Sequence, residues 1–283
     1  MPFQSGVASF PGLLRAPAEA GGATRAPLTV PELHEALANG WVSARYQPVV
    51  RMADRRPVAL EVLARVEHPA RGTLTPDLFI PQMEDAGLAW PLTQAITRRA
   101  FAEWGSGRLQ QFGLALALNV PLDVLLMPEA LDWLDATRAQ ADIPPTLITV
   151  ELTESRPLTQ LDALTAAARR LHDAGYEMAI DDVGPTVRDH RELLSMAFSV
   201  LKLDKDLVRN SESDPAANTF LMDSIAAARA ARLTIIAEGV EDEAVWARMA
   251  ALGIEQAQGF LIARPLPAAQ IPAWLDGWAA RGG

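Results

Sequence analysis

Cysteine is absent from this 283-residue chain, and only four histidines are scattered along it. The lack of cysteine excludes disulfides, thiolate zinc sites and cysteine nucleophiles, and the few histidines show no spacing typical of metal ligands. No apolar run approaches the roughly 20 residues that span a bilayer. The N-terminus also lacks the basic region followed by an apolar segment that marks an export signal. These absences predict a cytoplasmic protein without membrane insertion.

Positive charge is scarce as well, because 25 Lys and Arg residues stand against 35 Asp and Glu residues, for a formal net charge of −10. Nucleic-acid polymers and anionic membranes reward an excess of basic residues, so we expect neither as a partner. With 49% hydrophobic and 21% charged residues, the composition is that of an ordinary globular protein. The length fits a single α/β barrel of about 250 residues. Any anionic ligand therefore needs local positive charge.

Short β-branched runs alternate with helical patterns from Pro31 onward, which indicates βα units and a mostly parallel sheet. The expected strands cover residues 44–50, 58–66, 113–119, 147–152, 177–181, 199–204, 233–238 and 255–261. Such a series of strands favours a closed barrel. Helices are expected between them, for example at 158–174 and 242–252. We expect residues 1–27, rich in Gly, Ala and Pro, to form a flexible tail before one domain at 28–283.

Polar residues stand at the end of nearly every expected strand. In an α/β barrel, the carboxyl ends of the strands build the active site. A single polar residue at the end of a strand is explained by the strand reaching solvent there. Its repetition over successive strands favours a shared site. These residues are Glu61, Arg65, Asn119, Glu151, Asp181, Asp182, Lys202, Asp204, Glu238 and Gln258.

Five of these residues, Glu61, Glu151, Asp181, Asp182 and Glu238, are carboxylates. Crowded together, they would raise one another's pKa values unless cations lay among them. Oxygen ligands without Cys or His select Mg²⁺, Mn²⁺ or Ca²⁺. The number of carboxylates indicates two ions, which together can clamp the attacking and leaving oxygens of a phosphoryl displacement. Such ions would also offset the negative charge that opposes a phosphate ester.

Several motifs follow one another in a specific order. They are Tyr46-Gln47-Pro48, Glu61-Val62-Leu63-Ala64-Arg65, Phe79-Ile80-Pro81 with Glu84 and Gly87-Leu88, Asn119, Glu151-Leu152-Thr153-Glu154, Asp181-Asp182, Lys202-Leu203-Asp204, Glu238-Gly239-Val240-Glu241, and Gln258-Gly259-Phe260 with Pro265. In this order they resemble the EAL domain, the bacterial cyclic di-GMP phosphodiesterase domain, over roughly residues 28–279. Any one match is weak, whereas the ordered set is highly specific.

The resemblance implies a modified (β/α)8 TIM-like barrel whose first strand is antiparallel, and hydrolysis of cyclic di-GMP to linear pGpG with two Mg²⁺ or Mn²⁺ ions. Packing stays open as an alternative role for Leu63, as do strand-edge and turn roles for Gln47 and Pro265. The implied roles are catalysis by Lys202, Glu238 and Glu61, metal binding by Glu61, Asn119, Glu151, Asp181 and Asp182, substrate binding by Gln47, Leu63, Arg65, Asp204, Gln258 and Pro265, and loop anchoring by Glu154.

One segment departs from the family pattern. Where the family usually has DDFGTGYSS, this chain has Asp181-Asp182-Val183-Gly184-Pro185-Thr186-Val187-Arg188-Asp189. Pro185 fixes its own φ and restricts Gly184, so we expect a different loop path. The resemblance implies that this loop couples dimerisation to activity. We therefore expect low turnover unless a homodimer or a regulatory protein partner orders residues 183–189.

Two alternatives to an active phosphodiesterase stay open. A catalytically weak or inactive EAL domain would act as a cyclic di-GMP receptor or a protein-interaction module, and the altered loop favours this interpretation. The carboxylates oppose it, because a domain that only binds an anion has no need for them. The third alternative is an unrelated metal-dependent barrel hydrolase, which would make the order of the motifs a coincidence.

Overall fold

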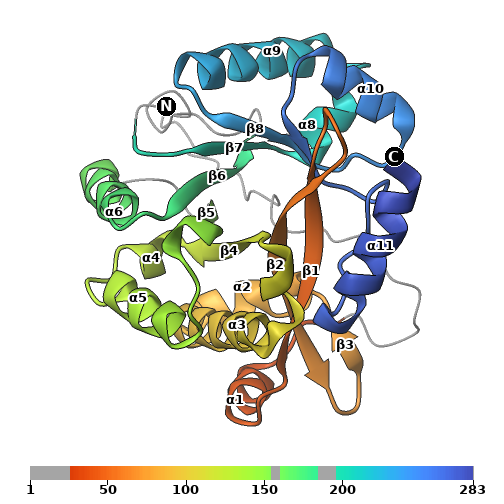
Figure 1. Cartoon of the computed structure of the whole chain (residues 1–283). Coiled ribbons are helices and arrows are strands. Elements are labelled where there is room, and N and C mark those ends of the chain that lie inside the picture. The colour runs from red at the N-terminus through yellow and green to blue at the C-terminus, as the bar shows by residue number, and fades with distance from the viewer. Residues whose placement is uncertain (1–25, 154–159, 184–195, 283) are drawn as a thin grey trace, which may run out of the picture.

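The structure is a computed structural model that describes residues 26–153, 160–183 and 196–282. The strands are β1 (Val42–Arg51), β2 (Pro57–His68), β3 (Gly72–Leu74), β4 (Ala115–Pro121), β5 (Ile148–Thr153), β6 (Glu177–Val183), β7 (Val200–Leu203), β8 (Thr234–Ala237) and β9 (Gln256–Ala257). The α-helices are α1 (Val30–Ala38), α2 (Ile80–Asp85), α3 (Ala89–Glu103), α4 (Leu122–Leu125), α5 (Ala130–Gln140), α6 (Leu161–Asp173), α8 (Lys205–Asn210), α9 (Pro215–Ala230), α10 (Glu243–Ala251) and α11 (Ile271–Gly282). Figure 1 shows the helices arranged around the strands.

The described strands form one sheet in the order β1-β9-β8-β7-β6-β5-β4-β2-β3, and an additional pairing of β1 with β2 closes it into a barrel. The strand β1 is antiparallel to both β2 and β9. From β2 through β4 to β9, the remaining neighbours within the barrel are parallel. The predicted eight-stranded barrel with an antiparallel first strand is therefore confirmed.

The structure corrects the predicted strand at 255–261, because β9 ends at Ala257. Beyond that point the chain packs against the backbone of Val240, which accepts a hydrogen bond from Leu261 and donates one to Gln258. A Cβ on Gly259 would lie 2.2 Å from the Val240 carbonyl oxygen, so only glycine allows this approach. The sequence prediction also missed β3, which forms an antiparallel hairpin with β2.

Alternation along the strands separates two hydrophobic layers. Residues that face outward pack under the helices in one large core, whereas Val49, Ala179, Val200 and Ile236 form a small cluster of their own. Members of this cluster precede polar residues by two positions, as Ala179 precedes Asp181 and Val200 precedes Lys202. Because residues two apart share a face of a strand, the cluster fills the barrel interior beneath the polar residues.

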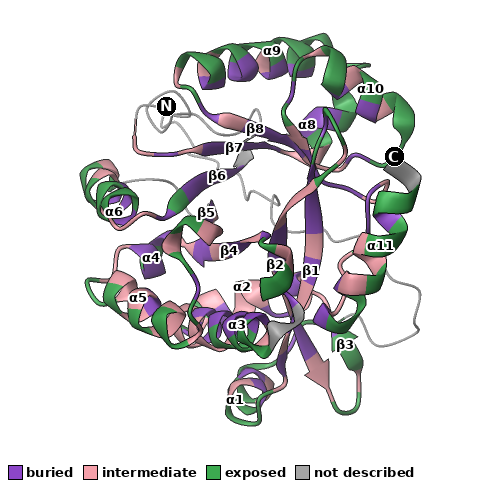
Figure 2. Cartoon of the chain, viewed as in Figure 1, coloured by how far each residue is buried: buried purple, intermediate pink, exposed green. Residues whose placement is uncertain are grey.

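The helices bury one side against the barrel, as Figure 2 shows by the change from purple to green around them. In α6, the buried residues Leu164, Ala168 and Leu171 recur at the spacing of one helix face. The prediction of a helix at 158–174 is confirmed for its described part. None of the helices in the described ranges has the length and apolar character needed to cross a membrane. The predicted tail lies mostly in residues 1–25, outside the described part of the chain.

Candidate active site

Polar side chains from successive strands meet on the inner side of the barrel. On β4 and β5 this follows from alternation, because Leu118, Val120 and Val150 belong to the outer core and their neighbours face the opposite way. The residues are Gln47 on β1, Glu61 on β2, Asn119 on β4, Glu151 on β5, Asp181 on β6 and Lys202 on β7, with Glu238 and Gln258 directly after β8 and β9.

Lys202 is the centre of this group. Its Nζ lies 2.8 Å from Glu151 Oε2, 2.9 Å from Asp181 Oδ1 and 2.8 Å from Glu238 Oε1. Glu61 Oε1 is farther away, at 3.8 Å. The Lys202 side chain is 1% exposed, whereas that of Glu238 is 17% exposed. One buried ammonium group thus faces several carboxylates, of which Glu238 is the one nearest to solvent.

Two amides orient Glu61 from the other side. Asn119 Nδ2 donates a 3.0 Å hydrogen bond to Oε1 of Glu61, and Gln258 Nε2 donates one to Oε2. The same Nε2 lies 3.1 Å from Gln47 Oε1, and Gln47 Nε2 in turn donates to the carbonyl oxygen of Ala263. This chain of contacts joins β1, β2 and the segment after β9, so it fixes the direction of the Glu61 carboxylate.

The carboxylates of this group outnumber the one ammonium group, that of Lys202, which they face. Burial raises the pKa of Glu151 well above its usual range, the charges of Glu61 and Asp181 raise it further, and Lys202 offsets this only in part. Burial also raises the pKa of Glu61, but Lys202, the two amides and Arg65 together hold it below its usual value. The site therefore favours an additional cation, which would let Glu151 ionise.

The residues present fit a divalent metal ion. Oxygens of Glu61, Glu151 and Asp181 lie within 4.8 Å of one another, and all three residues are buried. Gln258 Oε1 is buried and has no hydrogen-bond partner among the described residues. A buried acceptor of this kind normally has a partner, and a metal-bound water would supply one. An oxygen-only donor set with no Cys or His matches Mg²⁺ or Mn²⁺ rather than zinc or copper.

The family of this chain follows from its similarity to known proteins. Residues 31–265 match the EAL domain family, which is most of the chain. This chain belongs to the EAL domain family. It is 32% identical over 249 residues to the cyclic di-GMP phosphodiesterase RocR of Pseudomonas aeruginosa, covering 84% of this chain and 61% of RocR. The resemblance seen in the ordered motifs is therefore confirmed.

Other relatives extend this comparison. The bifunctional diguanylate cyclase/cyclic di-GMP phosphodiesterase MucR of Pseudomonas aeruginosa is 30% identical over 249 residues, covering 86% of this chain and 36% of MucR. The solved structure of the PaMucR phosphodiesterase in its cyclic di-GMP complex superposes with a TM-score of 0.79 at 28% identity, covering 86% of this chain and 98% of that chain. This chain thus spans about a third to three fifths of the length of these curated relatives.

Some residues predicted for the EAL site fall at or beyond the limits of the described structure. Asp182 belongs to β6, and the pairing of β6 with β7 shifts register between Ile180 and Val183. Irregularities of this kind often lie beside active sites. Glu154 and the altered loop from Gly184 onward lie outside the described residues. The proposed roles of Asp182 and Glu154 therefore stay predictions.

The other predicted site residues lie outside the group of carboxylates around Lys202. Arg65 is buried on the inner face of β2, and its Nη1 donates to the carbonyl oxygen of Ala64. Asp204 caps α8 through hydrogen bonds from two backbone N–H groups, so it has a structural function whether or not it binds substrate. Pro265 precedes Leu266, which pairs with the backbone of Tyr46 on β1. Leu63 is half-buried on the inner face beside the site.

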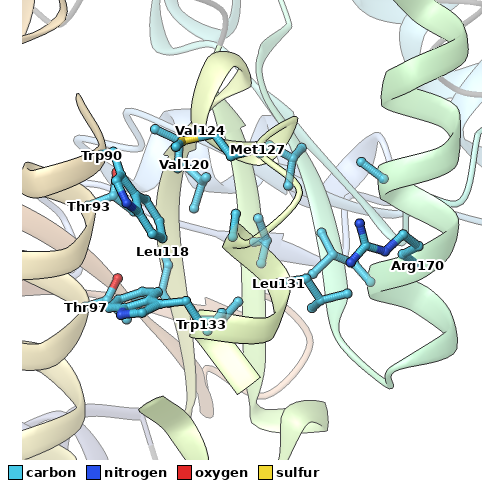
Figure 3. A pocket seen from close by; sticks show the side chains of 16 residues that line it. Trp90, Thr93, Thr97, Leu118, Val120, Val124, Met127, Leu131, Trp133 and Arg170 are labelled. Carbon is cyan, nitrogen blue, oxygen red and sulfur yellow. The ribbon is translucent and has the colours of Figure 1, made fainter. Parts of the chain in front are cut away.

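A separate pocket lies on the outer face of β4 and β5, lined by these strands and by helices α3, α4, α5 and α6 (Figure 3). Trp90 and Trp133 form part of its wall and meet edge to face, with ring centroids 5.1 Å apart. Among the described residues that line it, Arg170 alone is charged. This cavity offers no carboxylates, so it is not part of the candidate active site.

Two charged residues near the site, Arg45 and Glu67, were not among the predicted site residues. Arg45 precedes Gln47 by two positions on β1, and Glu67 follows Arg65 by two on β2. The period of two that identified Glu61 and Arg65 as neighbours on one face could have identified both. They were overlooked because neither belongs to a family motif.

Proposed function

We propose that this EAL domain hydrolyses one phosphodiester of cyclic di-GMP and releases linear pGpG, with two Mg²⁺ or Mn²⁺ ions as cofactors. The observation that carries the proposal is the buried group of Glu61, Glu151 and Asp181, whose oxygens are close enough to share one ion. The names of the relatives RocR and MucR, both described as cyclic di-GMP phosphodiesterases, support it.

The closeness of the Glu61, Glu151 and Asp181 oxygens supports these three residues as ligands of the first ion, and the family resemblance supports the other ligands. Glu61, Glu151, Asp181 and the amide oxygen of Asn119 would hold the first ion, and Asp181 with Asp182 the second. When bound, the ions supply Lewis-acid stabilisation of phosphoryl charge and lower the pKa of bound water. The hydrogen bond from Asn119 Nδ2 to Glu61 places this amide beside the carboxylate group, which supports a role for Asn119 there.

Lys202 and Glu238 are suited to position water and accept its proton. Hydrolysis to pGpG forms a bond between the water oxygen and phosphorus, breaks the P–O3′ bond, and leaves one water proton to be accepted while the ribose oxygen takes one up. Glu238 is the most exposed carboxylate in contact with Lys202, so it can reach a water that enters from the solvent side. Lys202 keeps its charge, because the carboxylates led by Asp181 raise its pKa despite the opposing effect of burial.

Substrate would be bound by residues at the margin of the carboxylate group. A guanidinium presents a fixed fork of donors that matches phosphate, which assigns Arg65 to a phosphodiester. Gln47, Gln258 and Leu63 lie next to Glu61 on the inner face and would contact the nucleotide, with Pro265 and Asp204 at its edge.

In this proposal, the altered loop lowers the rate of cyclic di-GMP hydrolysis and leaves the affinity for cyclic di-GMP unchanged. Asp182 directly precedes it, and a displacement of about 1 Å at a catalytic group can reduce the rate on the order of 100-fold. A homodimer or a regulatory protein that orders residues 183–189 would then raise turnover without changing the affinity for cyclic di-GMP.

The test is incubation of the purified protein with cyclic di-GMP and Mg²⁺ or Mn²⁺, followed by chromatography for pGpG. An identical sample with excess chelator is the control, and calorimetry measures cyclic di-GMP binding in parallel. Formation of pGpG only with metal supports the proposal. Binding without any pGpG supports the receptor alternative instead, and absence of both binding and product overturns both functions.

A further inference from the structure

The inner face of the β1–β2 pair continues past the carboxylates toward the barrel mouth. The register sets Gln47 opposite Glu61, Arg45 opposite Leu63, and Ser43 opposite Arg65. Because residues two apart share a face, Arg45 points to the same side as Gln47, and Arg65 to the same side as Glu61. Arg45 is displaced from the level of Glu61 by two residues, or about 7 Å. Two guanidinium groups thus follow the carboxylates along one strip.

Arg45 is held in this strip by Glu67. Its Nη2 lies 2.8 Å from Glu67 Oε1, which also accepts a 2.8 Å hydrogen bond from the hydroxyl of Ser43. Glu67 Oε2 accepts a 2.6 Å hydrogen bond from the hydroxyl of Thr73 on β3. Burial raises the pKa of Glu67, but these hydroxyls and Arg45 more than offset that effect and lower it. Glu67 is therefore ionised at neutral pH.

The ion pair is open to solvent, since the Arg45 side chain is 23% exposed and that of Glu67 is 41% exposed. A partly exposed ion pair contributes little to stability. The positive charge of Arg45 is nevertheless placed beside a site that is otherwise rich in carboxylates, where an anionic ligand needs cations. Guanidinium groups carry five N–H donors, so Arg45 can exchange Glu67 for a phosphate without moving far.

We propose that Arg45 binds the second phosphodiester of the cyclic dinucleotide, in competition with Glu67. This inference rests on the proposed function, in which the carboxylate group and Arg65 bind the phosphodiester that is cleaved. A cyclic dinucleotide carries two phosphodiesters, and only one of them can lie at the carboxylates. The other faces the mouth of the barrel, where Arg45 supplies a cation and Glu67 weakens binding by accepting from the same guanidinium.

The experiment compares Arg45→Ala with Glu67→Gln, because both substitutions remove the same ion pair. Calorimetry with cyclic di-GMP, in the presence of Ca²⁺, should show about tenfold weaker binding for Arg45→Ala, since a charge-assisted contact is lost. Glu67→Gln should bind about threefold more tightly, because Arg45 no longer has a charged competitor. Arg51→Ala is the matched control, because Arg51 lies at the other end of β1 in an exposed pair with Asp54, and its affinity should equal that of the native protein.

A purely structural ion pair gives a different result. In that case Arg45→Ala and Glu67→Gln would weaken binding in the same direction and lower the melting temperature together, and this outcome overturns the inference. Native affinity in both variants overturns it as well. Failure of the native protein to bind cyclic di-GMP would instead reject the proposed function, so the two failures are distinguishable.

Discussion

The two faces of β4 and β5 carry opposite kinds of side chain. On the inner face, Asn119 and Glu151 belong to a buried polar group around Lys202. On the outer face, one residue away, Leu118 and Val150 line an apolar cavity. The inner side thus contains charge that is not balanced within the protein, and the outer side contains space that is not filled. The same two strands therefore carry a buried polar group on one face and an apolar pocket on the other.

The largest expected effect comes from the inner face. Glu61→Gln removes a metal-binding charge while keeping the shape of the side chain, so hydrolysis of cyclic di-GMP should fall by at least about 1,000-fold, or about 4 kcal/mol of activation free energy. Product chromatography measures the rate, and the melting temperature should stay close to native. Glu243→Gln, at an exposed residue paired with Arg55, is the control and should keep full activity. Full activity in Glu61→Gln would refute its assigned role.

The second-largest expected effect is a loss of stability when the positive charge of Lys202 is removed. Lys202→Met leaves the surrounding carboxylates without their ammonium partner, so the metal-free protein should lose about 3 kcal/mol of unfolding free energy. Added Mn²⁺ should raise the melting temperature of this variant more than that of the native protein, because the ion replaces the missing positive charge. Thermal unfolding with chelator and with Mn²⁺ measures both quantities. An equal gain in the two proteins would show that metal and Lys202 do not share these carboxylates.

Shortening a leucine on the outer face of β4 should affect stability but not activity. Leu116 and Leu118 are both buried on the outer side of β4, but only Leu118 lines the cavity. Leu116→Ala should cost about 3–4 kcal/mol of unfolding free energy and Leu118→Ala about 2–3 kcal/mol, since Leu118 already lacks contacts on one side. Denaturant unfolding measures the difference. Activity at saturating metal and substrate should be unchanged in both.

The smallest effect is a gain in stability. Ala167 on α6 lines the cavity, so Ala167→Leu should fill part of it and raise the unfolding free energy by about 0.5–1 kcal/mol. Ala166→Leu, at the exposed neighbouring position of the same helix, is the matched control and should give no such gain. Equal melting temperatures for the two variants would mean that the cavity does not accept the larger side chain.

Much of the inner face could be predicted from sequence, because alternation along a strand is a local property. Glu61 and Arg65, or Lys202 after Val200, share a face whatever surrounds them. The series of expected strands indicated the closed barrel, and the resemblance carried by the ordered motifs implied its antiparallel first strand. Other features depend on contacts between distant segments. The early end of β9 follows from the approach of Gly259 to Val240, and the cavity from how α3, α5 and α6 meet. No local pattern encodes either feature.

The antiparallel direction of β1 has a consequence for how the barrel can be coupled to the rest of a chain. In a barrel with only parallel strands, the first strand enters at the end opposite the active site. Here β1 begins at Val42, paired with Val66 near the carboxyl end of β2, so the chain enters at the end where the carboxyl ends of the parallel strands lie. Helix α1 directly precedes that entry. Along the chain, α1 therefore adjoins the end of the barrel that carries Arg45 and Glu67, and the interior cluster of Val49, Ala179, Val200 and Ile236 lies beyond them.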